Sequence, residues 1–306
     1  MPIVTYTPIH ADAVVALYNA MAAPLPYCSP MDRTWFTDVI TAKHTFSPDL
    51  LWLFEEGGQA IGYIQCSFLS ESADEITLNR LVAGIDALCF TPNRLDVGEQ
   101  LIAAALDYLG RQGTREVGFW FNTGYPLYRG IWCGLEPAGC VSGAAHARQA
   151  LERAGFYLQQ TSHLWLVEMS GPPALVTSRL PVECRVAPHE FISLAERDSW
   201  RGIAVREASA WLDGQQVGLC LFAELPGYRE HRGYAAGCIG SLSVNSAMRR
   251  SGIASLLVSE TMRDLYTVGV RQVWVATQAF NIAAHFTYER MGFRRFAEIH
   301  VMGREL

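Results

Sequence analysis

The chain has 306 residues, half of them hydrophobic and 18% charged, and its formal net charge is −6. That apolar content excludes a disordered chain, and the length predicts about two domains. A nucleic-acid partner would require a basic surplus, which this chain lacks. No apolar run approaches the roughly 18 residues that span a bilayer, and the first residues lack the pattern of a secretory signal. We therefore expect a cytoplasmic small-molecule enzyme or protein-binding module, without membrane or nucleic-acid partners.

The eight cysteines predict a reduced protein without a metal site. None stands in a C-x-x-C pair, and several lie in apolar runs such as Ala87-Leu88-Cys89-Phe90. There a cysteine serves as a small hydrophobic residue. Cys133 and Cys140 could form a disulfide or half of a metal site, but no His or Cys stands nearby at zinc-like spacing.

The first half shows alternating strand and helix patterns. Strands are expected at residues 3–8, 50–54, 60–69, 84–90 and 116–121, and helices at 11–21, 32–42 and from about 96 to 113. Residues 55–59 form a hairpin turn between two of the strands. Asp96 followed by Glu99 is a capping-box pattern at the start of the third helix.

The second half repeats this order. Strands are expected at residues 207–212, 216–225, 237–244 and 272–277, with a helix beginning near Gly252. The stretch 113–117 recurs 156 positions later and the stretch 152–156 recurs 137 positions later. The 19 extra residues of the first half fall in a Gly-, Pro- and aromatic-rich loop at 124–142.

This internal repeat predicts two copies of one fold. We expect the first copy at residues 1–170, a linker at 171–183 beginning with Gly171-Pro172-Pro173, and the second copy at 184–306. Because the second copy has little sequence before its hairpin, its early helices should be shortened.

The strand-to-helix connection from Val244 to Ala254 contains an R-x-x-G-x-A pattern. The first turn of a helix leaves backbone N–H groups unpaired, and its dipole favours an anion. Gly252 and Ala254 are small enough for a pyrophosphate to approach the backbone. Arg249 and Arg250 add positive charge. The alternative is an ordinary loop with a tight helix start.

A second pattern lies near the C-terminus. Asn281, Ala284 and Tyr288 share one helix face, and Gly292 would supply the helix C-terminus. Tyr288 is either a packed core aromatic or a proton donor to a reacting group.

Together the two segments resemble the GNAT family (Gcn5-related N-acetyltransferases). The first is similar to the family's acyl-CoA pyrophosphate loop, Q/R-x-x-G-x-G/A, and the second to its N-x-x-A-x-x-x-Y-x-x-x-G-F pattern. These motifs cover about residues 237–293. The order of elements extends the resemblance to both halves, as in tandem members of the family. The resemblance implies an α/β fold with two tandem domains, each a mostly antiparallel mixed sheet flanked by helices with a splayed central strand pair.

The resemblance also implies an acetyltransferase that uses acetyl-CoA. A primary amine would attack the thioester directly, main-chain N–H near Val244 would polarise the carbonyl, and Tyr288 would protonate the departing thiolate. Asn281 would hydrogen-bond the cofactor arm. The expected cofactor-binding residues are Leu242, Ser243, Val244, Arg249, Arg250, Ser251, Gly252, Ile253, Ala254, Ser255, Asn281 and Ala284.

The first copy departs from both motifs. At the two offsets, the positions of Arg249, Gly252, Ala254, Asn281, Ala284 and Tyr288 are taken by Asn93, Asp96, Gly98, Ala144, Ala147 and Leu151. The carboxylate of Asp96 would repel phosphates or cap the helix itself, and Leu151 cannot donate a proton. We expect the first copy not to catalyse, and instead to shape the acceptor pocket or the packing between halves.

The general base and the acceptor loops stay open. Glu207, Glu224, Glu230 and His231 are candidate bases, although each is better explained as a solvated or strand-edge residue. The resemblance implies that a water chain often does this job in the family. Residues 226–234 form either an acceptor-binding loop or an exposed hairpin connection. Four aromatics of the extra loop either line an acceptor cleft or pack the loop onto its own domain; they are Trp120, Tyr125, Tyr128 and Trp132.

Three functions are compatible with these patterns. The leading one is an N-acetyltransferase acting on a small-molecule amine. The others are acetylation of a protein N-terminus or lysine, and a non-catalytic acyl-CoA-binding sensor. A homodimer is possible in each case.

Overall fold

The computed structural model describes residues 2–70, 77–119, 127–135 and 139–306. The N-terminal half contains β1 (Ile3–Thr5), η1 (Pro8–His10), α1 (Ala11–Ala22), α2 (Arg33–Trp35), η2 (Phe36–Ile40), η3 (Pro48–Leu50), β2 (Leu51–Glu56), β3 (Gln59–Ser70), β4 (Leu78–Phe90), α3 (Leu95–Arg111), β5 (Glu116–Phe119), β6 (Cys140–Val141), α4 (Ala145–Arg153) and β7 (Tyr157–Glu168). The C-terminal half contains β8 (Glu183–Pro188), α5 (Leu194–Ser199), β9 (Arg206–Leu212), β10 (Gln215–Glu224), α6 (Tyr228–Arg232), β11 (Ala236–Val244), η4 (Ser246–Met248), α7 (Ile253–Thr267), β12 (Gln272–Gln278), α8 (Ile282–Arg290) and β13 (Arg294–Glu305).

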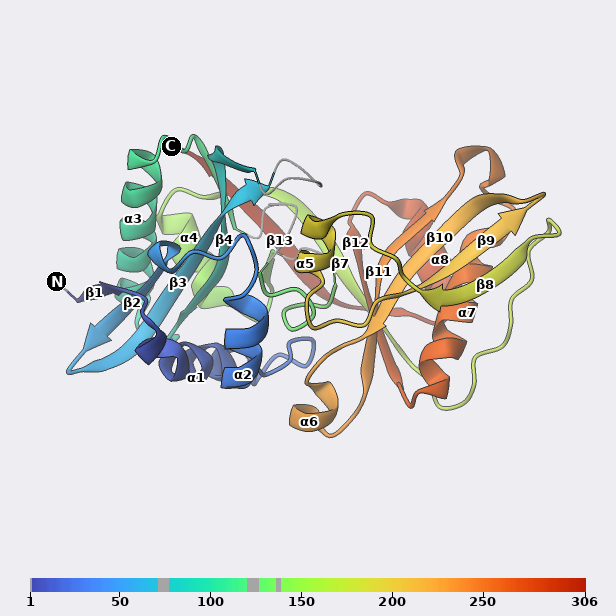
Figure 1. Ribbon diagram of the computed structural model, residues 1–306, viewed down its shortest axis with the longest axis horizontal. Helices are drawn as coiled ribbons and strands as arrows, with labels where there is room; N and C mark the ends of the chain where they lie inside the picture. Colours follow the sequence, from blue (N-terminus) through green and yellow to red (C-terminus); the bar gives the residue numbers. More distant parts are fainter. Residues whose placement is uncertain (1, 71–76, 120–126, 136–138) are drawn as a thin grey trace.

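The strands join in one sheet that runs through both halves (Figure 1). Its order is β1-β2-β3-β4-β5-β13-β7-β12-β11-β10-β9-β8, and β6 pairs with β13 beside this path. The pairs β4–β5 and β11–β12 are parallel, and the other neighbours are antiparallel. The expected α/β architecture of mostly antiparallel strands flanked by helices is confirmed.

The last strand of each half lies in the sheet of the other half. β13 pairs with β5 of the N-terminal half, and β7 pairs with β12 of the C-terminal half. Between these pairs, β7 and β13 pair with each other at the centre of the molecule. The C-terminus therefore lies among the N-terminal elements in Figure 1. The domain limits stay a prediction. The two exchanged strands, β7 and β13, connect the N-terminal and C-terminal halves in any case.

The two halves repeat the same local packing. Gly62 of β3 lies against Val97 of α3, and 156 positions later Gly218 of β10 lies against Ile253 of α7. The bounds of α4 and α8, and those of β7 and β13, differ by 137. Both offsets found in the sequence thus correspond to equivalent elements.

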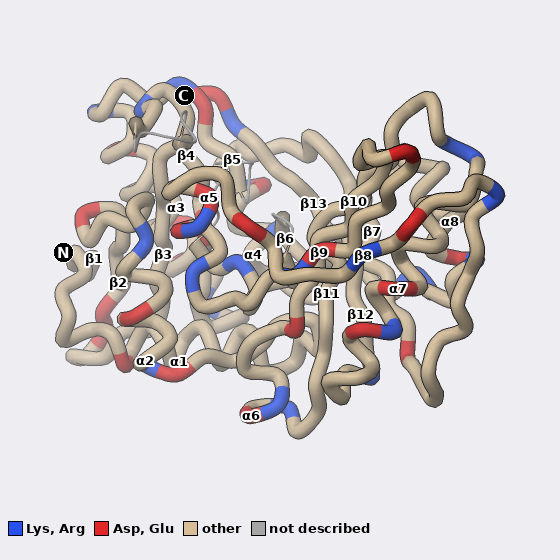
Figure 2. Tube along the Cα trace, turned by 45° about the vertical axis from the view of Figure 1, so that its right-hand side comes forward, with Lys and Arg blue, Asp and Glu red and all other residues tan. Residues whose placement is uncertain are grey.

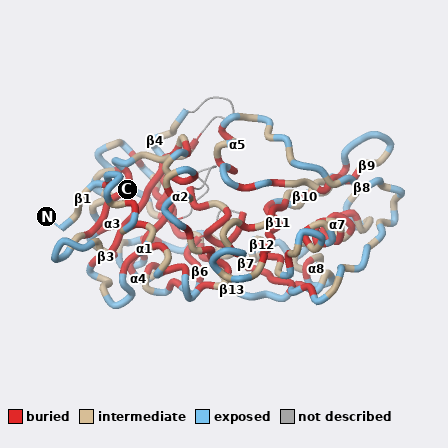
Figure 3. Tube along the Cα trace, turned by 60° about the horizontal axis from the view of Figure 1, so that its bottom comes forward, coloured by how far each residue is buried: buried red, intermediate tan, exposed pale blue. Residues whose placement is uncertain are grey.

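Buried residues line the sheet in both halves (Figure 3). The larger core cluster fills the N-terminal half and continues into the C-terminal half through Trp200, Tyr228 and Trp274. A second cluster lies between α7, α8 and the sheet, and includes Trp165 of β7. Since apolar burial is the main stabilising term, the halves are joined by a shared core as well as by strands.

Residues 226–234 contribute to the packing between the halves. The sequence indicated only an acceptor-binding loop or an exposed hairpin connection for this segment. It contains α6, whose Tyr228 is buried against the N-terminal half. Arg232 donates hydrogen bonds to the carbonyls at the end of α1 and just beyond it, at 2.8–3.0 Å. A cation at a helix C-terminus satisfies its unpaired carbonyls and its dipole, so α6 caps α1 across the boundary between the halves.

Several local expectations need correction. The helix expected at 32–42 is one α-helical turn followed by a π-helical turn, η2. The capping box at Asp96 is wrong, because α3 begins earlier and its N-cap is Arg94, without a side-chain cap. The shortening of the early helices in the second copy is confirmed, since α5 alone precedes β9 and has six residues.

The described part of the extra loop contacts both halves: its aromatics pack onto their own half, and the N–H of Leu135 donates to Cys238 Sγ of the other half at 3.4 Å. Tyr128 stacks on Tyr18 with ring centroids 5.5 Å apart, and Trp132 lies 6.1 Å from the same ring. Trp120 and Tyr125 lie outside the described residues.

The eight cysteines are free, as expected. None of the helices within the described ranges is both long and apolar enough to cross a membrane. Acidic and basic residues are interspersed over both halves (Figure 2).

Candidate active site

The strands β11 and β12 separate midway along their length. They pair only from Ala236–Gln272 to Ile239–Val275, although β11 continues to Val244 and β12 to Gln278. The separation begins at a bulge: Phe222 and Leu221 of β10 face Ile239 and Ser241, which leaves Gly240 as the extra residue. A bulge bends its strand and re-aims the residues after it. Beyond it, backbone groups of residues 241–244 face the gap.

The connection after β11 presents an open helix N-terminus. Gly252 is the N-cap of α7, with φ +92°, and Arg250 also has a positive φ of 63°. Neither a capping side chain nor an acidic residue lies in the first turn of α7. The first N–H groups of this helix are therefore available to an anion. Arg249 and Arg250 are exposed beside it.

The glycine at 252 has a structural reason in addition to the expected one, which stays a prediction. A Cβ at this position would lie 3.4 Å from the carbonyl oxygen of Thr177. The segment before β8 is fixed there, because the N–H of Arg179 and the hydroxyl of Ser178 both donate to the carbonyl of Ser251. Gly252 thus provides the left-handed backbone at the helix start, and the segment before β8 lies where its side chain would be.

α8 places Tyr288 in the core beneath the helix. Asn281 is the N-cap of α8: its Oδ1 accepts from the N–H of Ala284 at 3.3 Å, and its Nδ2 donates to Thr277 at 3.2 Å. Its amide thus anchors the helix to β12. Tyr288 is 4% exposed and its ring lies 5.6 Å from that of Phe293.

The strand under α8 comes from the N-terminal half. Trp165 of β7 lies 6.5 Å from Tyr288 and 5.3 Å from His285 between ring centroids. His163 lies 5.1 Å from His285. The pKa of His163 is lowered by burial and by the charges of Arg295 and His285. These neighbours could not be found from the sequence, because they follow from the strand exchange.

The equivalent connection in the N-terminal copy is closed. Only six residues (91–96) separate β4 and the equivalent of Ile253, against eight (245–252) in the other copy. None of residues 91–96 has a positive φ. α3 begins at Leu95, so Asp96 lies within its first turn.

Charged side chains and the ring of Phe90 lie at the start of α3. Arg94 pairs with Asp96 at 2.9 Å and with Glu56 at 2.8 Å. Arg94, and then the N–H groups of the first turn, lower the pKa of Asp96. The ring of Phe90 comes within 2.6 Å of the place that a Cβ on Gly98 would take. An incoming phosphate would meet carboxylates and filled space here.

The bulge of the N-terminal copy holds a buried acid where the other copy has Gly240. Asp86 is the extra residue of β4, 3% exposed. Burial raises its pKa to about 7. Burial likewise lowers the pKa of Lys43 to about 7, and the Lys43 ammonium donates to the carbonyl of Leu127 at 2.8 Å. This pair was not recognised in the sequence.

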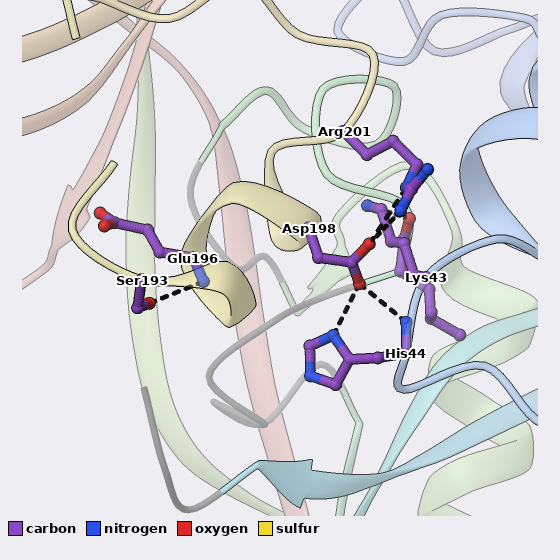
Figure 4. A network of polar contacts seen from close by, with 7 residues as sticks. Lys43, His44, Ser193, Glu196, Asp198 and Arg201 are labelled. Atoms are coloured by element: carbon purple, nitrogen blue, oxygen red, sulfur yellow. Dashed lines mark hydrogen bonds and ion pairs between the residues drawn. The ribbon is translucent and has the colours of Figure 1, made fainter. Parts of the chain in front are cut away.

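Helix α5 covers the opposite face of the C-terminal copy. Ser193 caps it, and Asp198 accepts from the backbone N–H of His44 at 2.7 Å (Figure 4). Asp198 also contacts the His44 ring at 2.6 Å and Arg201 at 2.6 Å. Just beyond α5, the ring of Trp200 lies against Gly240, as does Leu135 of the extra loop. Both halves thus form the wall of the sheet at the bulge.

The four candidate bases fall in three separate places. Glu207 contacts His189 at 2.7 Å, and Glu224 pairs with Arg229 at 2.7 Å. Glu230 and His231 line a cavity of about 390 Å³ between α2 and α6. No arrangement here selects one of them, and their role stays a prediction.

The structure brings together most of the site predicted from sequence. The end of β11 and the start of α7 carry residues 242–255, and α8 carries Ala284 and Tyr288 directly after Asn281. The sequence missed Trp165 and His163, which are contributed by the exchanged strand.

Comparison with known proteins agrees with this geometry. Residues 177–293 match the model of the acetyltransferase (GNAT) family. No curated protein matches the sequence.

Among solved structures, a GCN5-related N-acetyltransferase from Sphaerobacter thermophilus superposes with a TM-score of 0.68 at 17% identity, covering 99% of this chain and 95% of that one. A tandem GNAT protein from the clavulanic acid biosynthesis pathway gives 0.67 at 16% identity, covering 99% and 98%. Residues 177–293 are thus a domain of the acetyltransferase (GNAT) family, and the chain that carries it is an acyltransferase with a tandem GNAT fold.

Proposed function

We propose that the C-terminal copy transfers an acetyl group from acetyl-CoA to a primary amine of a small molecule, and that the N-terminal copy does not catalyse. The observation that carries this proposal is the contrast between two equivalent helix starts. α7 begins with free N–H groups, a left-handed glycine and two exposed arginines. α3 begins with Asp96 held by Arg94.

The residues around α7 fit a CoA pyrophosphate. Its first turn offers several N–H donors without an acidic side chain to repel phosphate. Residues Arg249 to Ser255 would hold the phosphates, and Leu242, Ser243 and Val244 would pair with the pantetheine arm in the gap beside β11. Bound acetyl-CoA supplies an acetyl group activated as a thioester.

The catalytic roles follow from position. Main-chain N–H groups of residues 242–244 would stabilise negative charge on the acyl oxygen. The Tyr288 hydroxyl would donate its proton to the leaving sulfur. Asn281 and Ala284 would border the arm at the start of α8.

A small acceptor is favoured by the covered face of the sheet. If the cofactor occupies the α7–α8 face, the amine approaches from the face of α5. There Trp200 and Leu135 lie against Gly240, which leaves little room for a folded protein or an extended peptide beside the reacting atoms.

Thiol release from acetyl-CoA with a panel of amines tests the proposal. We expect turnover with small primary amines and none without an amine. Turnover with peptides alone would favour a protein acetyltransferase. Tight CoA binding without turnover on any amine would favour the sensor and contradict the proposal.

A further inference from the structure

The N-terminal copy contributes a strand to the candidate site of the C-terminal copy. β7 pairs with β12 over seven residues, from Gln272–Glu168 to Gln278–Ser162. Within this ladder Trp165 faces Val275, and Val275 in turn faces Ile239 of β11. Trp165 therefore lies level with the point at which β11 and β12 separate.

Trp165 is the residue of the exchanged strand whose ring contacts both Tyr288 and His285 of α8. Its side chain is 3% exposed, and Tyr288 and His285 lie 6.5 and 5.3 Å from it between ring centroids. His163, two residues earlier on the same face, extends this contact toward the start of α8. Aromatic rings in such contact restrict each other's orientation.

The N-terminal copy lacks this arrangement at equivalent positions. In that copy Leu151 occupies the position equivalent to Tyr288. Met302 of β13 pairs with Phe119 and occupies the position equivalent to Trp165. Leu151 and Met302 are both buried in the core. Methionine is flexible and specifies position less well than an indole. The copy that carries the candidate acid, Tyr288, is thus also the copy that carries an aromatic residue beneath it, Trp165.

We propose that Trp165 is a positioning residue that sets the orientation of Tyr288, so that the C-terminal site is incomplete without strand β7 of the N-terminal copy. The inference rests on the proposed function. It gives the N-terminal copy a role in the reaction that requires no ligand of its own.

The test uses the full chain with Trp165→Leu, Trp165→Phe, Tyr288→Phe and the double variant Trp165→Leu/Tyr288→Phe. Trp211→Leu is the control, because Trp211 lies on β9 and contacts Arg185 and Ser209 rather than α8. We measure kcat and KM for acetyl-CoA, and the hydrogen exchange of the α8 amides.

We expect Trp165→Leu to lower kcat by about tenfold, since small misplacements of a catalytic group cost one to two orders of magnitude. KM for acetyl-CoA should change less than about twofold, because the phosphates bind at α7. Trp165→Phe should retain most of kcat, and the double variant should be no slower than Tyr288→Phe.

Two results would overturn the inference: a kcat for Trp165→Leu equal to that of Trp211→Leu, or a double variant slowed by the product of the single effects. The exchange measurement separates this inference from the proposed function. If the wild type transfers no acetyl group, the proposed function fails. Faster exchange of the α8 amides than of the α7 amides in Trp165→Leu would still support the packing of α8 on Trp165, and unchanged exchange would contradict it.

Discussion

Single residues distinguish the two copies at the positions that matter for chemistry. Tyr288 and Leu151 are equivalent and both buried, and only the tyrosine carries a proton. The motif spacing was sufficient to find Tyr288. It could not show that Trp165 lies beside it, since 123 positions of sequence separate the two residues.

Tyr288→Phe should lower kcat about a hundredfold at neutral pH while acetyl-CoA still binds. Proton transfer by a positioned acid contributes roughly two to four orders of magnitude, and the ring that packs on Trp165 is retained. Steady-state kinetics combined with calorimetric titration measures both quantities. Wild-type turnover in the variant would exclude Tyr288 as the acid.

Asp86→Asn should change how stability depends on pH. Burial raises the pKa of Asp86 from 3.8 to about 7, so the folded protein binds more protons than the unfolded chain between these values. The contribution of this carboxyl to stability is present at pH 4 and is lost as the pH rises through 7. The buried amine of Lys43, with its pKa lowered to about 7, acts mainly above this window.

Denaturant titrations at pH 5, 6 and 7.5 measure this effect. The unfolding free energy of the wild type relative to Asp86→Asn should fall with rising pH. A constant difference would show that Asp86 is ionised throughout.

At the scale of elements, the sequence predicted the position of the connection between β11 and α7 but not its length relative to the other copy. The position of R-x-x-G-x-A was found from the sequence. The sequence did not show that this connection is two residues longer than in the N-terminal copy. Two extra residues between Cys66 and Ile85 of that copy restore the offset of 156 in the following helix. Pattern counting therefore aligned Asp96 with Gly252 across loops of unequal length.

Gly252→Ala should weaken both the fold and acetyl-CoA binding. A φ of +92° costs an L-residue about 1–2 kcal/mol, and the new methyl would lie 3.4 Å from the carbonyl oxygen of Thr177. Gly214→Ala is the matched control, with φ +77° and nothing near its Cβ. It should lose similar stability and keep the Kd for acetyl-CoA. Equal Kd values for both variants would contradict a role of the α7 start in binding.

The helix expected at 32–42 shows another limit of periodicity. A π-helical turn at η2 shifts the following residues, which brings Lys43 inside and His44 against Asp198. The partner lies on α5 of the other half, so no local pattern could indicate this ending.

At the scale of the whole molecule, the repeat was predictable and the exchange of its last strands was not. β5 and β12 are equivalent strands of the two copies. β7 and β13 therefore each pair with the same kind of strand, whichever half supplies it. The sequence is therefore equally compatible with separate or crossed sheets.

The exchange predicts that fragments 1–170 and 171–306 associate when they are produced together. Each lacks a strand that the other supplies, and an unpaired sheet edge favours pairing. Co-purification followed by size-exclusion chromatography should give a 1:1 complex, with the separate fragments aggregating or unfolded. Two independently folded, monomeric fragments would contradict the exchange.

Arg232→Ala should destabilise the chain by about 3 kcal/mol, because four carbonyls in or near the end of α1 lose a charged donor. Arg111→Ala is the control, since Arg111 forms an exposed pair with Asp107 and such pairs contribute about 0–1 kcal/mol. Denaturant unfolding measures the difference, and equal losses would contradict the capping of α1 by α6.

A crystal structure with acetyl-CoA would show directly which copy holds the cofactor. We expect one molecule per chain, with its pyrophosphate on the first turn of α7 at Gly252 and its sulfur near Tyr288. Density for the cofactor at Asp96 and the start of α3, or at a site away from α7, would contradict the assignment of catalysis to the C-terminal copy.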